Sequence, residues 1–196
     1  MKLSVKGIKA VSASPKTKDY PVFLNDEATK PVRKLHSSLT GYEPTPLVVL
    51  DKLAKELGVK NIYVKDESKR FSMNAFKALG ATYAMARVLC DRLGVSIDEA
   101  DFNYFKSKEV KAKIADLVFV TATDGNHGRG VAWTAKQLKQ KAIVYMPKGS
   151  TQERFENIKS ENAEVTITDL NYDDAVRLAN DEAKKHGWVM VQDTSW

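Results

Sequence analysis

A lysine stands where a short predicted strand and a polar loop lead into a long predicted helix. The strand covers residues 61–64, the loop covers residues 65–70, and the helical pattern begins near Asn74 with Lys77 in its first turn. The first turn of a helix presents unpaired N–H groups and the positive end of the helix dipole, which favour the neutral form of an amine. Because a Schiff base forms through a neutral amine, Lys77 is a candidate nucleophile. A solvated lysine on the flank of a helix is the alternative that this position leaves open.

A second group of chemically useful residues lies between the next predicted strand and helix. Three glycines occur within residues 125–130, so the backbone can approach a ligand closely, and the N–H groups of the following helix can bind an anion. The glycines do not follow the G-x-G-x-x-G order, which argues against a nicotinamide cofactor. His127 is one of only three histidines, which are widely separated, so we expect no metal site.

These two groups require a scaffold that places strand ends side by side. From residue 117 onward, apolar runs alternate with helical patterns, which predicts an α/β fold with a parallel sheet and right-handed crossovers. We expect strands at residues 117–120, 142–146, 164–167 and 188–191. We expect three helices in this region. The first covers residues 131–138, the second begins at a capping box at residues 150–153, and the third covers residues 172–186 and stops at Gly187.

The first half of the chain has a weaker pattern. We expect an irregular segment at residues 1–27, a weak helix at 28–39, and a helix that Asp51 caps and Gly58 ends. The helix with Lys77 should end by Gly94, and the charged residues 95–116 should form one or two short surface helices.

Composition places the chain among ordinary globular proteins. It has 196 residues, of which 43% are hydrophobic and 29% charged. The net charge is +6, but basic and acidic residues alternate, so we expect attraction for anionic ligands and no nucleic-acid partner. Cys90 is the single cysteine and lies in an apolar helical run, which predicts a buried side chain. No stretch has the length of a membrane span or the pattern of a signal peptide, so we expect no membrane partner and a cytoplasmic location.

The two groups together resemble the fold type II, tryptophan synthase β-like family of pyridoxal-phosphate enzymes. The resemblance rests on Asn-Ala-Phe-Lys at residues 74–77 and on residues 124–132, with lead-in motifs at 44–47 and 65–67. It extends over nearly the whole chain from about residue 35. Within this superfamily, the sequence is most similar to the diaminopropionate ammonia-lyase family, because Asp124 stands where serine and threonine dehydratases usually carry serine. Further matches to that family lie at residues 66–71, 145–149, 171–174 and 191–194.

The resemblance implies that pyridoxal 5'-phosphate is the cofactor. Lys77 would bind it as a Schiff base and would act as acid and base once released by the amino group of the substrate. Asn126 would form a hydrogen bond with the ring oxygen of the cofactor. The implied reaction is the α,β-elimination of ammonia from 2,3-diaminopropionate, which gives pyruvate and a second ammonia. The alternatives are an ammonia-lyase of the serine or threonine dehydratase type and a non-catalytic binding module that keeps the fold.

The resemblance also implies which residues bind the substrate. The carboxylate of the amino acid would lie on the loop formed by Thr123, Asp124, Gly125 and His127. A neighbouring carboxylate favours the protonated form of Asp124, which would make Asp124 a second proton-transfer group, on the other face of the substrate from the lysine, for activity on both enantiomers. Asp193 would lie near the β-amino group as a further catalytic residue. A helix cap for Asp124 and a turn residue for Asp193 are the alternatives.

A domain division follows from the same resemblance. Residues 1–78 would belong to a large domain and residues 79–192 would form a small α/β domain with helices on both faces of its sheet. The phosphate-binding loop and the residue opposite the pyridine nitrogen would lie outside this chain. We therefore expect a truncated chain that is inactive by itself, and a homodimer for the full-length protein.

Overall fold

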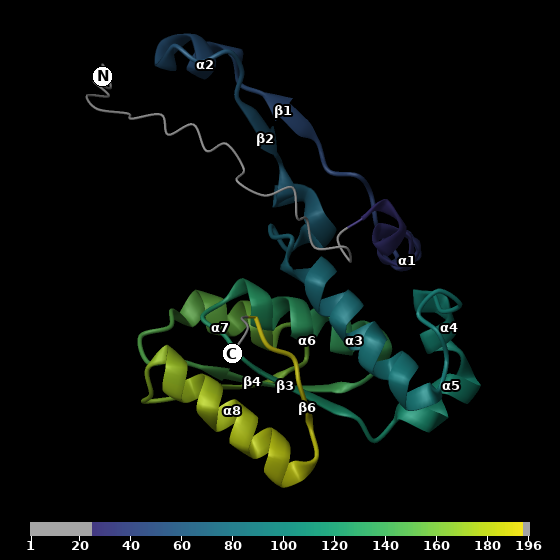
Figure 1. Cartoon of the computed structure of the whole chain (residues 1–196). Coiled ribbons are helices and arrows are strands. Elements are labelled where there is room, and N and C mark those ends of the chain that lie inside the picture. The colour runs from purple at the N-terminus through teal and green to yellow at the C-terminus, as the bar shows by residue number, and fades with distance from the viewer. Residues whose placement is uncertain (1–24, 194–196) are drawn as a thin grey trace, which may run out of the picture.

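The computed structural model describes residues 25–193 of the 196-residue chain. Figure 1 shows an α/β unit and a narrow arm that projects from it. The irregular segment expected at residues 1–27 lies outside the described residues except for its last three, which open the first helix.

A four-stranded parallel sheet forms the centre of the α/β unit. Its strands run in the order β5, β4, β3, β6, and each neighbouring pair is parallel. The last strand crosses over to pair with the free edge of β3, where Val120 lies opposite Met190. The predicted parallel α/β fold is therefore confirmed, with the strands β3 Val118–Ala122, β4 Lys141–Met146, β5 Glu164–Ile167 and β6 Val189–Met190.

Helices cover both faces of this sheet (Figure 1). Three helices, α3, α6 and α7, pack on one face, and α8 packs on the other. Successive side chains of a strand point to opposite faces, so Phe119 enters the larger core with α3 and α6, whereas Val120 enters the smaller core with α8. The bounds of these helices are α3 Lys77–Leu93, α6 Asn126–Leu138, α7 Gln152–Lys159 and α8 Tyr172–His186.

The ends of α3 and α8 follow the predicted stops, whereas the cap of α7 differs from the prediction. Gly94 ends α3 and Gly187 ends α8, both in the left-handed conformation with φ of 68°. The cap of α7 is Thr151, whose hydroxyl accepts a hydrogen bond from the N–H of Arg154 at 3.4 Å. The capping box expected at residues 150–153 is therefore shifted by one residue.

The start of α6 differs from the expectation. The helix begins at Asn126, whereas the sequence pattern places its start at residue 131. The sequence pattern does not reveal the first turns because they contain Gly128 and Gly130, and glycine lowers helix propensity. Glycine is nevertheless required by packing, since a Cβ at Gly128 would lie 2.2 Å from Cγ2 of Thr123.

The charged segment 95–116 forms two short helices, α4 (Phe102–Lys106) and α5 (Lys108–Ile114). The sequence places them on the surface, but the structure buries one side of each in the larger core. Neither helix is long enough for a clear apolar period, so the sequence pattern alone indicates only an irregular charged segment. The buried side chains are Phe102, Phe105, Val110 and Ile114.

Four elements and a short 3-10 segment precede α3. Their bounds are α1 Asp26–Ser37, β1 Leu47–Val49, α2 Asp51–Leu57, β2 Tyr63–Lys65 and the 3-10 segment Glu67–Ser72. β1 pairs antiparallel with β2 and was not predicted, because Pro44 and Pro46 favour a loop. Leu50 occupies the cap position of α2 without a side-chain hydrogen bond, so the predicted Asp51 cap is wrong.

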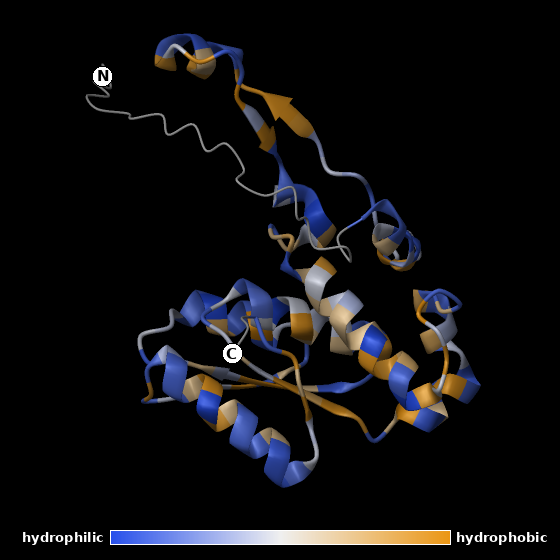
Figure 2. Ribbon diagram, viewed as in Figure 1, coloured by the Kyte–Doolittle hydropathy of each residue, from blue (hydrophilic) through white to orange (hydrophobic). Residues whose placement is uncertain are grey.

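The hairpin arm, defined as residues 47–65, leaves apolar side chains exposed. Figure 2 shows hydrophobic stretches on both of its strands, and each residue of β1 and β2 is exposed. In α2 only Ala54 is buried, while Leu53 and Leu57 are exposed. Of the apolar face expected for α2, only Ala54 is packed, and the leucines of the helix remain exposed.

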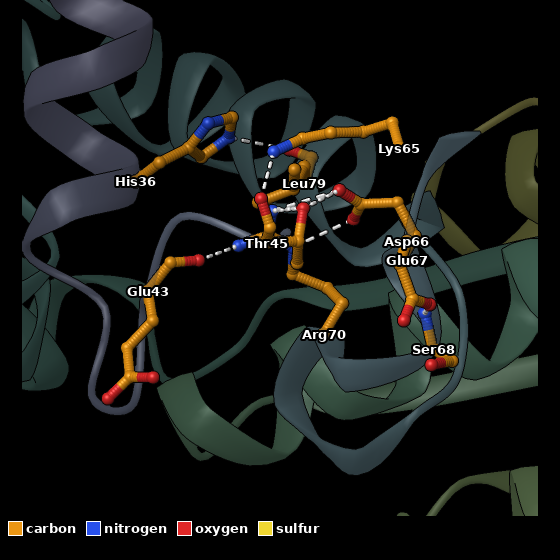
Figure 3. A network of polar contacts seen from close by, with 9 residues as sticks. All are labelled: His36, Glu43, Thr45, Lys65, Asp66, Glu67, Ser68, Arg70 and Leu79. Atoms are coloured by element: carbon orange, nitrogen blue, oxygen red, sulfur yellow. Dashed lines mark hydrogen bonds and ion pairs between the residues drawn. The ribbon is translucent and has the colours of Figure 1, made fainter. Parts of the chain in front are cut away.

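A polar network fastens the base of the hairpin arm (Figure 3). Buried Arg70 donates hydrogen bonds to the two carboxylate oxygens of Glu67 at 2.9 and 3.1 Å, and to the carbonyl of Glu43 at 2.7 Å. The Arg70 guanidinium holds the pKa of the Glu67 carboxyl below its usual value. The Thr45 hydroxyl also donates to Glu67, and the Lys65 ammonium donates to the Thr45 carbonyl. A buried cation persists only with such partners, so this network fixes the segment that leads into α3.

Two expectations from composition concern Cys90 and membrane spans. Cys90 is buried in the larger core, as predicted, and burial raises the pKa of its thiol. Across residues 25–193, none of the helices combines the length and the apolar character that crossing a membrane requires.

Replacing Gly128 with alanine should destabilise the protein by about 2 kcal/mol or more, because the added methyl group overlaps Thr123 in a close-packed core. Gly80→Ala is the matched control, since Gly80 also lies inside a helix and a Cβ there would meet nothing within 4 Å. The control should stabilise the protein by roughly 0.5–1 kcal/mol. Urea denaturation followed by circular dichroism measures both, and equal effects would contradict the packing role of Gly128.

Candidate active site

One cavity of about 270 Å³ gathers six of the seven residues that the sequence singles out. It lies beyond the carboxyl ends of the parallel strands, where ligand sites of open α/β sheets are found. The seventh residue, Thr123, is buried directly beneath the loop that forms one wall. The lining residues are Lys77, Asp124, Gly125, Asn126, His127, Arg154 and Asp193. Arg154 is the one that sequence reasoning missed.

The segment before Lys77 is sharply folded. Phe71, Ser72 and Asn74 have φ of 48°, 58° and 57°, in the left-handed region. Asparagine tolerates this conformation, but phenylalanine and serine rarely adopt it. The ring of Phe71 stacks on Trp133 of α6, with the ring centroids 4.7 Å apart. This backbone strain is held by the stacking contact, and it delivers Lys77 as the first residue of α3.

A backbone contact holds Lys77 close to the second motif. A Cβ at Gly130 would lie 3.0 Å from the backbone of Lys77 and Ala78, so only glycine lets α6 approach the start of α3 this closely. The side chain of Lys77 is about one-third exposed, at 34%, and its ammonium forms an ion pair with Asp193. The structure thus brings together a lysine and a carboxylate that are far apart in the sequence.

His127 fixes the chain that carries Asp193. Its Nε2 lies 2.9 Å from the carbonyl oxygen of Val191, and because a carbonyl only accepts, Nε2 carries the hydrogen. Burial lowers the pKa of His127, and the hydrogen bond to Val191 and the charge of Asp193 offset this only in part. The other ring nitrogen, Nδ1, lies 3.6 Å from Oδ1 of Asp193. The substrate-binding role expected for His127 stays a prediction.

Thr123 organises the glycine loop from below. Its buried hydroxyl oxygen accepts hydrogen bonds from the N–H groups of Gly125 and Gly128, at 3.0 and 3.1 Å. These two N–H groups are thus bound within the loop. The hydroxyl hydrogen of Thr123 takes no part in these two hydrogen bonds. The loop is a rigid support for the residues that face the cavity, Asp124 and Asn126.

Asp124 faces solvent at the mouth of the cavity. Its side chain is 73% exposed, and Oδ2 lies 3.6 Å from Nη1 of Arg154. The cap position of α6 is Gly125, and the helix has no side-chain cap. The alternative in which Asp124 caps this helix is therefore wrong, and the carboxylate remains available at the cavity.

Arg154 comes from the first turn of α7, after the carboxyl end of β4. Its Nη1 donates a hydrogen bond to the backbone carbonyl of Asp124 at 3.0 Å. The feature that marks Lys77 also marks Arg154, since both are cations in the first turn of a helix that follows a strand. Applying the same criterion throughout the sequence would have found it.

The residues around the cavity fit an aromatic aldehyde as a bound group. Lys77 offers a primary amine, and Asn126 offers a side-chain amide that can donate to a ring oxygen. A second cavity of about 290 Å³ shares Lys77, His127 and Asp193 with the first. Its remaining walls are mainly apolar and suit a flat ring, with Phe76, Gly80, Ala81, Ala84 and Val191 among them.

The fold and these donors agree with comparisons to known proteins. The chain belongs to the pyridoxal-phosphate dependent enzyme family, whose model matches residues 39–195. This confirms the predicted cofactor, pyridoxal phosphate. The sequence is 54% identical to diaminopropionate ammonia-lyase of Salmonella typhimurium over 173 residues, which cover 88% of this chain and 43% of that protein.

A solved structure and a more distant relative extend the comparison. The crystal structure of Escherichia coli diaminopropionate ammonia lyase in apo form matches with a TM-score of 0.85 and 49% identity, over 92% of this chain and 48% of that chain. The biosynthetic L-threonine dehydratase of Haemophilus influenzae is 29% identical, over 75% of this chain and 24% of that protein. The predicted fold type II is confirmed, and the chain spans less than half the length of these relatives.

The free energy of unfolding should fall as the pH drops below about 6.5. Burial lowers the pKa of both His36 and His127, so the unfolded chain binds protons that the folded chain resists. The stability that these residues contribute is complete above the unfolded-state pKa and is lost as the pH falls through the lower folded-state values.

Urea denaturation at about pH 7.5 and about pH 5.5 tests this dependence. The loss of stability between the two pH values should shrink in a His36→Gln, His127→Gln double variant. It should persist in His186→Gln, which changes an exposed histidine on α8. An undiminished loss in the double variant would contradict the assignment.

Proposed function

We propose that this chain carries the lysine and the proton-transfer carboxylates of a diaminopropionate ammonia-lyase. The reaction is the α,β-elimination of 2,3-diaminopropionate to pyruvate and ammonia. The observation that carries the proposal is the gathering of Lys77, Asp124 and Asp193 around one cavity, in a chain about half identical to two such enzymes. Pyridoxal phosphate, when bound, supplies an electron sink that stabilises negative charge on the α carbon of an amino acid.

Lys77 and Asn126 are the residues that would hold the cofactor. The amine of Lys77 would bond the aldehyde of the cofactor, and the amide of Asn126 would donate to its ring oxygen. Once released by the amino group of the substrate, the Lys77 amine would act as a base for the α proton. The ion pair with Asp193 supports this role, because the carboxylate fixes the position of the Lys77 nitrogen.

Asp124 is the second group that moves an α proton. It and Lys77 line the same cavity from different elements, Asp124 from the loop after β3 and Lys77 from the start of α3. Two such groups on different faces of the substrate serve the two enantiomers, because each enantiomer presents its α proton to one face. The serine of the dehydratases lacks a carboxylate for this purpose.

Asp193 assists the departure of the β-amino group. That group leaves as ammonia only when it carries an extra proton, and a carboxylate stabilises the positive charge of the protonated group. Asp193 already binds the ammonium of Lys77, which supports its ability to accept a hydrogen bond from a second ammonium. Two carboxylates at the cavity favour a diamino acid over serine, whose hydroxyl has no positive charge.

The organisation of the protein belongs to the same proposal. We assign residues 1–78 to a large domain and residues 79–192 to a small α/β domain; the projection of the hairpin arm away from the sheet supports a division near the start of α3 (Figure 1). A homodimer is supported by the exposed apolar side chains of the arm. The single, buried cysteine accords with a cytoplasmic, reducing location.

Steady-state kinetics of the full-length gene product that contains this chain tests the proposal. With pyridoxal phosphate bound, kcat/KM for 2,3-diaminopropionate should exceed that for serine or threonine by about 100-fold or more, because the carboxylates at the cavity recognise the β-amino group. A preference for serine or threonine would indicate the dehydratase alternative. No turnover of any of the three would indicate a non-catalytic module.

A further inference from the structure

The guanidinium of Arg154 lies against the peptide that carries Asp124. Its Nη1 is 3.0 Å from the Asp124 carbonyl oxygen and 3.6 Å from Oδ2 of the Asp124 carboxylate. One side chain therefore contacts both the backbone and the functional group of the same residue. A planar guanidinium has five N–H donors in a fixed geometry, which suits it to two acceptors at once.

Gly125 leaves the space that this contact occupies. A Cβ at Gly125 would lie 3.4 Å from Cδ, 3.6 Å from Nε and 3.8 Å from Cζ of Arg154. The arginine thus packs along the face of the peptide between Asp124 and Gly125. The contact holds the loop in place as a clamp, with the carboxylate on one side and the glycine on the other.

The base of Arg154 is itself fixed. Its backbone N–H is bound by the hydroxyl of Thr151, the cap of α7. The same helix buries Ile158 in the larger core. Because this packing anchors α7, the fold fixes the position of the guanidinium, and the guanidinium in turn holds the loop.

We propose that Arg154 is a positioning residue for Asp124. This inference rests on the proposed function, in which Asp124 removes the α proton of one enantiomer. In that step the α C–H bond breaks, its electron pair stays with the α carbon, and the proton moves to an oxygen of Asp124. Arg154 exchanges no proton, because a guanidinium stays protonated in proteins. It orients the accepting oxygen and holds the loop that carries it at the mouth of the cavity.

The ion pair of Arg154 is too exposed to act mainly through stability. The side chains of Arg154 and Asp124 are 55% and 73% exposed, and exposed pairs contribute little to folding. An effect on the orientation of Asp124 can be much larger than an effect on stability, since a displacement of about 1 Å in a reacting group can cost roughly 100-fold in rate. The effect of Arg154 is therefore expected in catalysis by Asp124 and in the order of the loop.

Hydrogen exchange of the loop tests the clamp without an activity measurement. In Arg154→Gln, the amides of residues 124–128 should exchange roughly threefold faster or more, because the Asp124 carbonyl loses its charged donor. The matched control is Arg177→Gln, which removes an exposed arginine paired with Asp174 on α8. Unchanged exchange in Arg154→Gln, or the same change in the control, would overturn the clamp.

Kinetics with the two enantiomers of 2,3-diaminopropionate test the positioning role in the full-length holoenzyme. Asp124→Asn identifies the enantiomer that Asp124 serves. Arg154→Gln should lower kcat for that enantiomer by about tenfold and change the other less than about threefold. Arg154→Lys should recover part of the loss, and Arg177→Gln should behave as the parent. In an Asp124→Asn, Arg154→Gln double variant the second substitution should add no further loss.

Two outcomes would assign Arg154 differently. A rise in KM of similar size for both enantiomers would show that Arg154 binds the substrate carboxylate, and it would overturn the positioning role. Loss of both activities together with faster exchange throughout the protein would mark a merely structural residue and would also overturn it. If the parent holoenzyme turns over neither enantiomer, the proposed function fails, while the exchange experiment still decides whether the clamp exists.

Discussion

The close approach of α3 and α6 is the constraint on which the site depends. At Gly130 the backbones of the two helices come so near that any side chain would press on the first residues of α3. Protein interiors are close-packed and yield little to such pressure. A contact between backbones therefore places the Lys77 amine beside Asn126 and His127. Side chains do not have to hold the two helices together here, and they can serve the chemistry of the site.

The parallel sheet adds the remaining groups from three neighbouring strand ends. Asp124 follows β3, Arg154 follows β4 and Asp193 follows β6, and the strand order places these ends at one edge. The result is two pairs of opposite charge, Lys77 with Asp193 and Arg154 with Asp124. In the proposed function each carboxylate has a separate task, and each is held by its own cation.

The sequence predicts most of this arrangement because its signals are local. A strand, a polar loop and a helix in succession locate Lys77, and three glycines between a strand and a helix locate the loop at residues 123–127. Alternating apolar runs give the parallel sheet, whose four strands begin and end within two residues of their expected bounds. Such features need no knowledge of which strands are neighbours.

The misses arise where non-local packing decides the structure. Arg154 has a local signal, a cation in the first turn of a helix after a strand, but its contact with Asp124 depends on the pairing of β4 beside β3, which no short window of sequence reveals. The start of α6 contains two glycines that weaken the helical pattern and that close contacts with other elements require. The short helices α4 and α5 bury aromatic and aliphatic side chains within a charged segment, and the cap of α7 is shifted from the expected box by one residue.

Borohydride reduction of this chain with pyridoxal phosphate, followed by peptide mass mapping, shows whether the fold makes Lys77 the lysine that binds the cofactor. Among the lysines of this chain, the reduced adduct should concentrate at Lys77, and Gly130→Ala should weaken this selectivity by displacing the start of α3. Labelling spread over the exposed lysines with none concentrated at Lys77, in this chain and in the full-length gene product alike, would contradict this role of Lys77.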